Sequence, residues 1–287
     1  MIRKIVVTLL FTGFYLSPVA AAELTGTLQQ IKKSGEIKIG FRENEPPMSF
    51  VGSEGKPVGY SIDICSRIVT AVKEKVGTEV KVKYVPVTAQ NRFSALTENK
   101  IDILCGSTTK TLARGEIVDF TQLTFITGAA LMTLKSSNFR ELANLNGKKI
   151  GVVKNTTTVK VLNKLLKDSL TDAKVVEVDT ASQGMEKLRS GAIAAFSADQ
   201  IVLIGLVVTS KDAAKFEVST DVFSYEPFAL AVRRNDADFR LVADRAISQL
   251  YRTGQIVPIY DKWFAAFAKQ RPKILDALFL INATPEG

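Results

Sequence analysis

The chain has 287 residues, of which 46% are hydrophobic and 23% are charged, and its formal net charge is +9. This composition is typical of a globular protein and excludes a disordered or fibrous one. The sequence contains no histidine, which excludes Ser–His and Cys–His nucleophile pairs and all histidine metal ligands. Its two cysteines cannot hold a structural zinc ion alone. A hydrolase or metalloenzyme is therefore disfavoured, and a binding protein is favoured.

Residues 1–22 have the layout of a secretory signal peptide. Arg3 and Lys4 form a positive start, residues 5–16 are mostly apolar, and residues 20–22 are all alanine. The apolar run is short for a membrane span of about 20 residues, so we expect cleavage before Glu23 rather than an uncleaved anchor. No cysteine follows the run directly, which disfavours a lipid anchor. A second apolar run, residues 201–208, predicts a buried helix or strand.

Export bears on the two cysteines, Cys65 and Cys105. In an oxidising compartment, two cysteines of a small exported protein can form a disulfide. Two separate buried thiols fit the sequence equally well. Both alternatives remain open from the sequence.

Strand and helix patterns alternate in the first part of the expected mature chain. Strands are predicted at residues 36–41, 80–85 and 101–104. A helix opens at 59–61, has apolar residues at helical spacing from Ile64 to Val76, and ends at Gly77. Thr88 is predicted to cap a second helix that carries Arg92. The order is β-α-β-α-β.

A second series starts near residue 130 and has the same order. Strands are predicted at 149–153, 174–178 and 192–196, with helices after the polar turn 155–158 and around Met185, the latter ending at Gly191. A strand at 228–232, a helix ended by Gly254 and a final helix around Trp263 follow. Two such series predict an α/β protein with two lobes, each built on a largely parallel sheet.

Polar residues follow several of these strands directly. In open α/β sheets, ligands bind beyond the carboxyl ends of the strands, and two lobes that meet there form a cleft. The residues in this position are Arg42, Ser107 to Thr109, Thr156 to Thr158 and Asp199.

Several segments resemble the periplasmic amino-acid-binding proteins of ABC transporters, solute-binding protein family 3. The matching segments are 40–43, 58–63, 105–109 with Arg114, 118–120 and 254–264. The resemblance covers nearly all of the expected mature chain in order. Segment 87–92 and the Cys-Gly-Ser-Thr-Thr turn at 105–109 are similar to the glutamate/aspartate-binding branch.

The resemblance implies a type II periplasmic-binding-protein fold, with two lobes joined by two hinge strands. Lobe 1 is expected to comprise residues 23–126 and 232–287, and lobe 2 residues 127–231, with hinges near 127–129 and 228–230. The family implies that ligand binding closes the lobes and that a membrane permease reads the closed form. It also implies a periplasmic monomer without a cofactor or metal.

The resemblance assigns the groups that would hold an amino acid. Arg114 would pair with the α-carboxylate, because a guanidinium matches its charge and geometry. Ser107 and Thr109 would add hydrogen bonds, and Thr157 would bind the same carboxylate from lobe 2 at a helix N-terminus. Asp199 would bind the α-ammonium. Capping roles for Thr157 and Asp199 are the local alternatives.

Arg42 and Arg92 match the positions that face the ligand side chain in the glutamate/aspartate branch. They favour an acidic ligand, because a neutral ligand would leave buried cations unpaired. Two positions depart from the branch: Ala89 stands in place of serine, and Ala181 in place of histidine. The pocket is therefore expected to be roomier there, unless Ser182 or Gln183 compensates, and the specificity broader or different. Met48 is expected either to line the pocket or to pack in the core.

Three other classes of function compete with this interpretation. A periplasmic dehydratase on the same fold would need a positioned acid, for which Glu43, Glu45 and Glu226 are the candidates. A sensor module is disfavoured because no signalling segment is appended. Nucleic acid is excluded as a partner by export and by the lack of a long Lys/Arg block. The sequence therefore favours a receptor over an enzyme.

Overall fold

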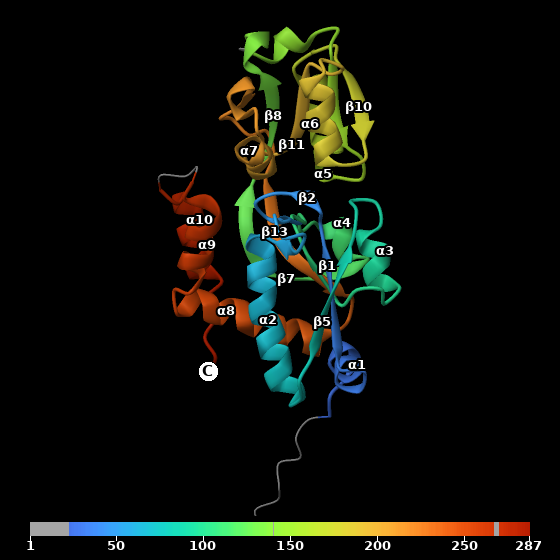
Figure 1. Ribbon diagram of the computed structural model, residues 1–287, viewed down its shortest axis with the longest axis vertical. Helices are drawn as coiled ribbons and strands as arrows, with labels where there is room; N and C mark the ends of the chain where they lie inside the picture. The colour runs from blue at the N-terminus through green and yellow to red at the C-terminus, as the bar shows by residue number, and fades with distance from the viewer. Residues whose placement is uncertain (1–22, 140, 267–269) are drawn as a thin grey trace, which may run out of the picture.

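The computed structural model describes residues 23–139, 141–266 and 270–287. The predicted signal peptide, residues 1–22, lies outside the described residues. Two lobes, each with its own central sheet, are stacked along the long axis of the molecule (Figure 1). The mixed α/β architecture confirms the predicted fold class.

Lobe 1 is built on a five-stranded sheet. Its order is β5 (Lys81–Pro86), β1 (Glu36–Phe41), β6 (Ile103–Cys105), β13 (Glu226–Arg233) and β7 (Val118–Thr127). β1 runs parallel to β5 and β6, whereas β13 pairs antiparallel with β6 and β7. A small second sheet beside it contains β2 (Asn44–Glu45), β3 (Ser49–Val51) and β4 (Pro57–Val58). The carboxyl ends of β1 and β6 thus point to one edge.

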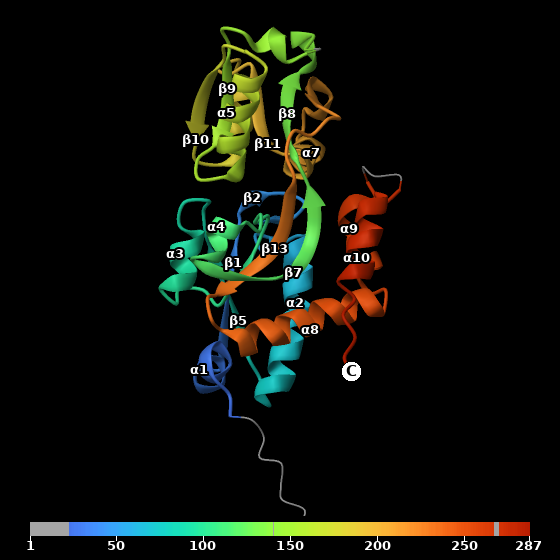
Figure 2. The same cartoon turned by 180° about the vertical axis from the view of Figure 1, so that it is seen from behind.

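Seven helices belong to the described part of lobe 1. They are α1 (Gly26–Ser34), α2 (Tyr60–Val76), α3 (Arg92–Thr97), α4 (Leu112–Gly115), α8 (Ala237–Arg252), α9 (Ile256–Phe264) and α10 (Lys273–Ile281). The sequence did not predict α10 or the small β2–β3–β4 sheet. Figures 1 and 2 show α3 and α4 on one side of lobe 1, and α9 and α10 on the other.

Lobe 2 has a second five-stranded sheet. Its order is β10 (Lys174–Val178), β9 (Lys149–Val153), β11 (Ala195–Asp199), β8 (Ala129–Leu134) and β12 (Phe216–Val218). Its helices are α5 (Thr157–Asp168), α6 (Ala181–Arg189) and α7 (Gln200–Thr209), with short 3-10 turns η1 (Lys135–Ser137), η2 (Leu142–Leu145) and η3 (Ala213–Lys215). The apolar run 201–208 lies within α7, so it is a helix. β11 starts at Ala195, later than the predicted 192, because Gly191 turns the chain with a φ of 73°.

The chain crosses between the lobes twice. The first crossing passes from β7 to β8 through Gly128. Beside it, the Phe223 N–H donates to the Ala129 carbonyl at 2.9 Å, and the Ala129 N–H donates to Ser224 Oγ at 2.9 Å. A side chain on Gly128 would overlap the Ser224 carbonyl. The expected second hinge, 228–230, lies inside β13, which belongs to the lobe 1 sheet. The return crossing therefore precedes Glu226.

The two cysteines are bonded to each other. Cys65 on α2 and Cys105 at the end of β6 form a disulfide whose Cα atoms are 6.4 Å apart. Of the two alternatives that the sequence left open, the structure has the disulfide. Because residues 106–109 follow Cys105 directly, the bond ties α2 to the strand that positions this turn.

The core of lobe 1 contains an aromatic cluster formed by Tyr60, Phe125, Phe228 and Phe264. In lobe 2, Phe196 of β11 is fully buried against Gly184 of α6, where any side chain would overlap its ring. No helix in the described ranges is both long and apolar enough to cross a membrane.

Candidate ligand site between the lobes

The turn after β6 is fixed from both sides. Ser61 Oγ of α2 donates to the Gly106 carbonyl at 3.0 Å, and the Ala229 N–H donates to the Thr108 carbonyl at 3.1 Å. Thr109 also forms an isolated β-bridge with Phe228. The turn therefore presents Ser107 and Thr109 at the face of lobe 1 that meets lobe 2.

Arg114 reaches back to this turn from α4. Thr111 caps the helix by accepting from the Arg114 N–H at 3.2 Å. The Arg114 guanidinium donates to the Thr109 carbonyl at 2.7 Å and lies 5.4 Å from the centre of the Phe93 ring. Burial lowers its pKa, whereas the charges of Glu226 and Asp199 raise it. These effects place Arg114 within electrostatic reach of both carboxylates.

Arg92 is a buried cation on α3. Its exposed fraction is 2%, and its guanidinium lies 4.8 Å from the centre of the Phe93 ring. It donates to the Asn155 carbonyl of lobe 2 at 3.4 Å. Burial first, and then Arg42 and Arg114, lower the pKa of Arg92 to about 9. The group remains charged at neutral pH but is poorly compensated, so an anion beside it would be stabilised.

Arg42 follows β1 and is also buried. Its backbone N–H donates to Ser49 Oγ at 2.9 Å. Its guanidinium forms an ion pair with Glu45 at 2.7 Å, and Ser107 donates a hydrogen bond to the other oxygen of Glu45. Gly106 leaves space for the Arg42 stem, because a Cβ there would lie 2.9 Å from Arg42 Cγ.

Thr109 of lobe 1 and Thr157 of lobe 2 meet at a buried carboxylate. Their hydroxyls donate to the same oxygen of Glu226, at 2.6 and 2.7 Å respectively. Ser224 donates to the second oxygen at 2.8 Å. Thr157 is the first residue of α5, so the helix N-terminus also faces this point. In this arrangement both threonine hydroxyls are engaged with Glu226.

Asp199 ends β11 and precedes α7. Burial is the largest cause that raises its pKa well above the ordinary value. The charges of Glu226 and Glu45 raise this pKa further, whereas Arg114 and Arg92 lower it. The Asp199 side chain accepts no capping hydrogen bond from the N-terminus of α7. The local alternative of a simple helix cap therefore does not describe this residue.

Within the described ranges, three buried side-chain polar atoms lack a hydrogen-bond partner in the protein: Arg92 Nε, Thr108 Oγ1 and Asp199 Oδ1. Arg92 and Asp199 are among the sequence-predicted ligand residues, and Thr108 belongs to the turn between Ser107 and Thr109. Buried polar groups are normally satisfied, so this concentration indicates a place that receives a polar ligand.

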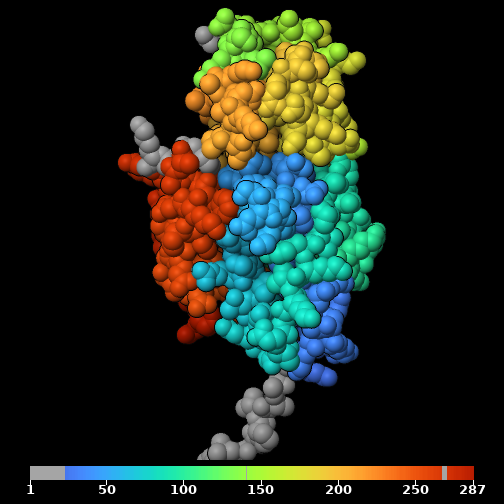
Figure 3. Space-filling view, viewed as in Figure 1, coloured from blue at the N-terminus to red at the C-terminus, as the bar shows by residue number. Residues whose placement is uncertain are grey.

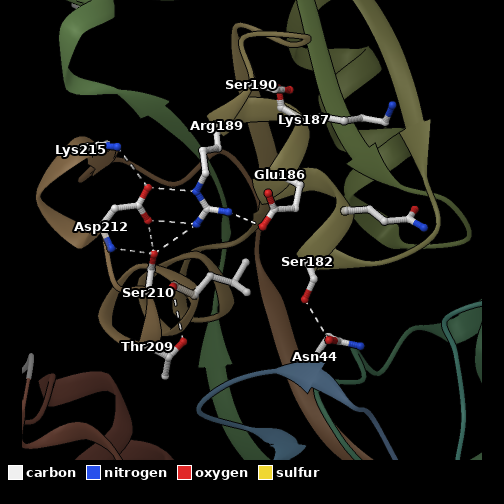
Figure 4. Close-up of polar contacts among 12 residues, drawn as sticks. Asn44, Ser182, Glu186, Lys187, Arg189, Ser190, Thr209, Ser210, Asp212 and Lys215 are labelled. Carbon is white, nitrogen blue, oxygen red and sulfur yellow. Dashed lines mark hydrogen bonds and ion pairs between the residues drawn. The ribbon is translucent and has the colours of Figure 1, made fainter.

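The lobes touch each other around this place. Ser182 Oγ of lobe 2 donates to Asn44 Oδ1 of lobe 1 at 2.9 Å (Figure 4). Gly205 of α7 lies so close to Pro46 that a side chain would overlap its carbonyl. Figure 3 shows lobe 2, in yellow and orange, resting directly on the blue part of lobe 1. The arrangement is therefore a closed one.

The expected pocket-lining residues are buried. Met48, Ala89 and Ala181 all belong to the main hydrophobic cluster. Ser182 is bound to Asn44, and Gln183 Oε1 accepts from the Asp179 N–H at 2.9 Å. The two side chains that the sequence offered as a possible compensation for Ala181 are thus engaged elsewhere.

An open groove of about 890 Å³ adjoins the two threonines. It lies between α4 of lobe 1 and α5 of lobe 2, which face each other in Figures 1 and 2. Its lining includes Thr109, Thr157, Tyr225, Glu226 and Arg240. The described residues contain no cluster of three or more metal-binding side chains.

Sequence reasoning did not assign Glu45, Glu226 or Phe93 to the ligand site. Glu45 lies three residues after Arg42, a spacing that was available as a signal for an ion pair. Phe93 is adjacent to Arg92, but only the fold shows that its ring also contacts Arg114. Glu226 lies 117 residues from Thr109, and no local pattern predicts their contact.

Fold, site and sequence agree on the class of protein. The family model for bacterial extracellular solute-binding proteins, family 3, matches residues 37–266. The chain therefore belongs to this family, which confirms the resemblance described above.

The chain is similar to named relatives and to a solved structure. The chain is 35% identical over 259 residues to the L-glutamate/L-aspartate-binding protein of Pseudomonas aeruginosa, spanning 90% of this chain and 86% of the relative. It is 32% identical over 246 residues to a glutamate/aspartate import solute-binding protein of Escherichia coli, spanning 85% and 82%. The crystal structure of a cysteine-binding protein from Campylobacter jejuni superposes with a TM-score of 0.75 at 27% identity, covering 88% and 98%.

Proposed function

We propose that the chain is an exported receptor that captures an acidic L-amino acid between its two lobes and delivers it to the permease of an ABC transporter. The observation that carries this proposal is a pair of buried, unpartnered atoms on ionisable side chains, Arg92 Nε of lobe 1 and Asp199 Oδ1 of lobe 2. An anion would stabilise Arg92, and a cation would stabilise Asp199.

An acidic amino acid supplies three charges that match this site. Arg114 would bind the α-carboxylate, joined by the N-terminus of α5 at Thr157. Asp199 would bind the α-ammonium, and Arg92 would bind the side-chain carboxylate. Ser107 and Thr109 would complete the polar wall of the site, with Arg42 beside it. A neutral amino acid would leave Arg92 without an anion, which is costly for a buried charge.

The relatives support the same ligand class. Both relatives described above are named as glutamate- and aspartate-binding proteins. The Campylobacter jejuni protein of the same fold is named as a cysteine-binding protein. The fold is therefore compatible with several ligands, and the charges of the site carry the specificity argument. Since Ala89 and Ala181 present no polar group, we expect weaker discrimination between acidic ligands of different length.

We also propose how the protein is exported and how its lobes move. The signal peptide would be removed before Glu23, and the mature monomer would act in the periplasm without a cofactor. Ligand binding would close the lobes about the two crossings, near residues 127–129 and 223–226. Mass measurement of the secreted protein tests the cleavage site, and a mature chain that retains residues before Glu23 would contradict it.

We propose no enzymatic activity. The carboxylates that a dehydratase would need are engaged: Glu45 with Arg42 and Ser107, and Glu226 with three hydroxyls. Glu43 is exposed. A dehydratase assay on prephenate and arogenate is expected to give no product above the uncatalysed rate.

Calorimetric titration against the twenty amino acids tests the main proposal. Glutamate, aspartate or both are expected to bind most tightly. Tight binding of neutral amino acids together with no binding of either acidic one would contradict the acidic specificity. Failure of every amino acid to bind would contradict the receptor assignment itself.

A further inference from the structure

The two arginines expected at the ligand side chain are not equivalent. The Arg42 guanidinium is paired with Glu45 at 2.7 Å, and both side chains are nearly inaccessible, with exposed fractions of 7% and 11%. Ser107 donates to the second oxygen of Glu45. The Glu45 carboxylate therefore has a partner on each oxygen, and Arg42 has an anion supplied by the protein itself.

Among the described residues, Arg92 forms no ion pair. It donates a hydrogen bond to the Asn155 carbonyl at 3.4 Å, and the Phe93 ring covers one face of the guanidinium. Its Nε is buried without a partner in the described part of the chain. A neutral carbonyl and an aromatic face compensate a buried cation much less than a carboxylate does.

The difference has a consequence for the ligand. If both arginines were free, the side-chain end of the site would hold two uncompensated positive charges. Glu45 leaves one, because the Arg42–Glu45 pair is neutral as a unit. Glu45 also lies close enough to influence the pKa values of Arg92 and Asp199, so its charge acts within the site itself.

We infer that Glu45 is a specificity-determining residue. Its carboxylate pairs with Arg42 at the position where a ligand carboxylate would otherwise bind. Arg92 is then the group that holds the ligand's side-chain carboxylate. This inference rests on the proposed function and deepens it: the site takes a ligand with a single anionic group beyond the α-carboxylate. It also lowers the penalty for an uncharged amide such as glutamine, because one cation instead of two is left unpaired.

A purely structural role is the competing explanation. The loop after β1 folds back so that Arg42 N–H bonds Ser49 Oγ, and the Glu45 carbonyl accepts from the Met48 N–H at 2.9 Å. In that explanation, the Arg42–Glu45 pair serves only to hold this loop. The two roles differ in a measurable way, since a structural pair affects all ligands equally, whereas a specificity device changes their ratio.

The first test compares Glu45→Gln with the native protein by calorimetry, using L-glutamate and L-glutamine as probes. Glutamine keeps the size of the side chain but removes its charge, so Arg42 becomes available to the ligand. The ratio of glutamine Kd to glutamate Kd is expected to rise about tenfold or more. Glu43→Gln, which removes the same charge from an exposed neighbour, is the matched control and should leave the ratio unchanged.

The second test uses Arg42→Gln alone and in combination with Glu45→Gln. Arg42→Gln leaves Glu45 as an unpaired anion in the site, so glutamate binding is expected to be largely lost. The double variant removes that anion and should regain most of the lost glutamate affinity. If Arg42 holds the ligand directly, the double variant will bind glutamate no better than the single one, and the inference is wrong.

Failure of the inference and failure of the proposed function give different results. An unchanged glutamine/glutamate ratio in Glu45→Gln, with native protein that binds glutamate, overturns the inference alone. Native protein that binds neither ligand overturns the proposed function. Thermal unfolding of each variant distinguishes lost binding from lost structure, and equal weakening of both ligands in folded Glu45→Gln establishes the structural role instead.

Discussion

Arg92 and Arg114 carry the same charge in the same site, yet they should contribute to binding in different ways. Arg114 contacts the turn that ends in Thr109, and under the proposed function it binds the α-carboxylate, which every amino acid has. Arg92 is proposed to bind the side-chain carboxylate. Arg114→Ala should therefore abolish binding of all amino acids, and Arg92→Ala should weaken acidic ligands most, by about 2–5 kcal/mol.

Calorimetry with glutamate and glutamine measures how much each arginine contributes to the binding of each ligand. Arg67→Ala, at an exposed position of α2 in the same lobe, is the control for loss of a positive charge. Equal losses of glutamate and glutamine on Arg92→Ala would refute the assignment of Arg92 to the side chain.

Asp199 should make binding depend on pH. Burial, Glu226 and Glu45 raise its pKa, so in the closed arrangement without a ligand it keeps its proton to a higher pH than an ordinary aspartate does. The ligand ammonium requires the ionised form. Glutamate affinity should therefore fall as the pH is lowered from about 8 to about 5, where the ligand's own side-chain carboxyl is still ionised.

Titrations in two buffers of different ionisation enthalpy will detect the proton released on binding. Asp199→Asn should bind more weakly and show no pH dependence over this interval. The same affinity for the native protein at both ends of the interval would exclude a role for Asp199 ionisation in binding.

The sequence predicted which candidate site residues lie just after strands, and the topology brings Arg42, Thr109 and Asp199 to one sheet edge in each lobe. It could not predict which charges would pair. The conformation of residues 42–49 decides whether the Arg42 side chain points to the ligand or to Glu45. The contacts of Glu226 join segments from three separate parts of the chain. Such choices depend on tertiary distances that no local pattern contains.

At the scale of elements, helix α7 contains a glycine, Gly205, that allows the two lobes to come into contact. Gly205 lies in the interior of this helix, where alanine would be more favourable by about 0.5–1 kcal/mol. In the closed arrangement, however, any side chain at this position overlaps the Pro46 carbonyl of lobe 1. The glycine therefore indicates a requirement of closure rather than of the helix.

Gly205→Ala should separate these two effects. We expect unchanged or slightly higher stability of the ligand-free protein in urea, and glutamate binding weakened tenfold or more because the lobes cannot meet, an effect of about 1.4 kcal/mol. Small-angle X-ray scattering should show that this variant stays extended with ligand. Native affinity in Gly205→Ala would mean that closure does not bring α7 onto Pro46.

The elements themselves were predicted well where one pattern dominates. The apolar spacing of α2 and its end at Gly77, with a φ of 71°, are both readable in the sequence. The two-residue strand β2 and the helix α10 were missed, because β2 is too short for a periodic pattern, and α10 is apolar on several sides, with Leu280 and Ile281 exposed.

For the whole molecule, closure has an electrostatic cost that the ligand would remove. The closed arrangement buries Arg92 Nε, Thr108 Oγ1 and Asp199 Oδ1 without protein partners. Each unsatisfied buried group costs about 1–3 kcal/mol, and more if it is charged. Contacts such as Ser182–Asn44 offset part of this cost. A ligand with matching charges should therefore shift the population strongly towards the closed form.

A cross-link between the lobes tests this shift directly. Asn44 and Ser182 lie on opposite lobes with their side-chain oxygens 2.9 Å apart, so cysteines introduced by Asn44→Cys and Ser182→Cys would come within bonding reach when the lobes are closed. The native cysteines are already bonded to each other. Under mild oxidation, glutamate should accelerate cross-linking of the double variant several-fold, whereas lysine, whose side chain repeats the charge of Arg92, should not. Asn44→Cys alone controls for exchange with the native disulfide. Equal rates with glutamate, with lysine and without ligand would show that the charges of the site do not control closure.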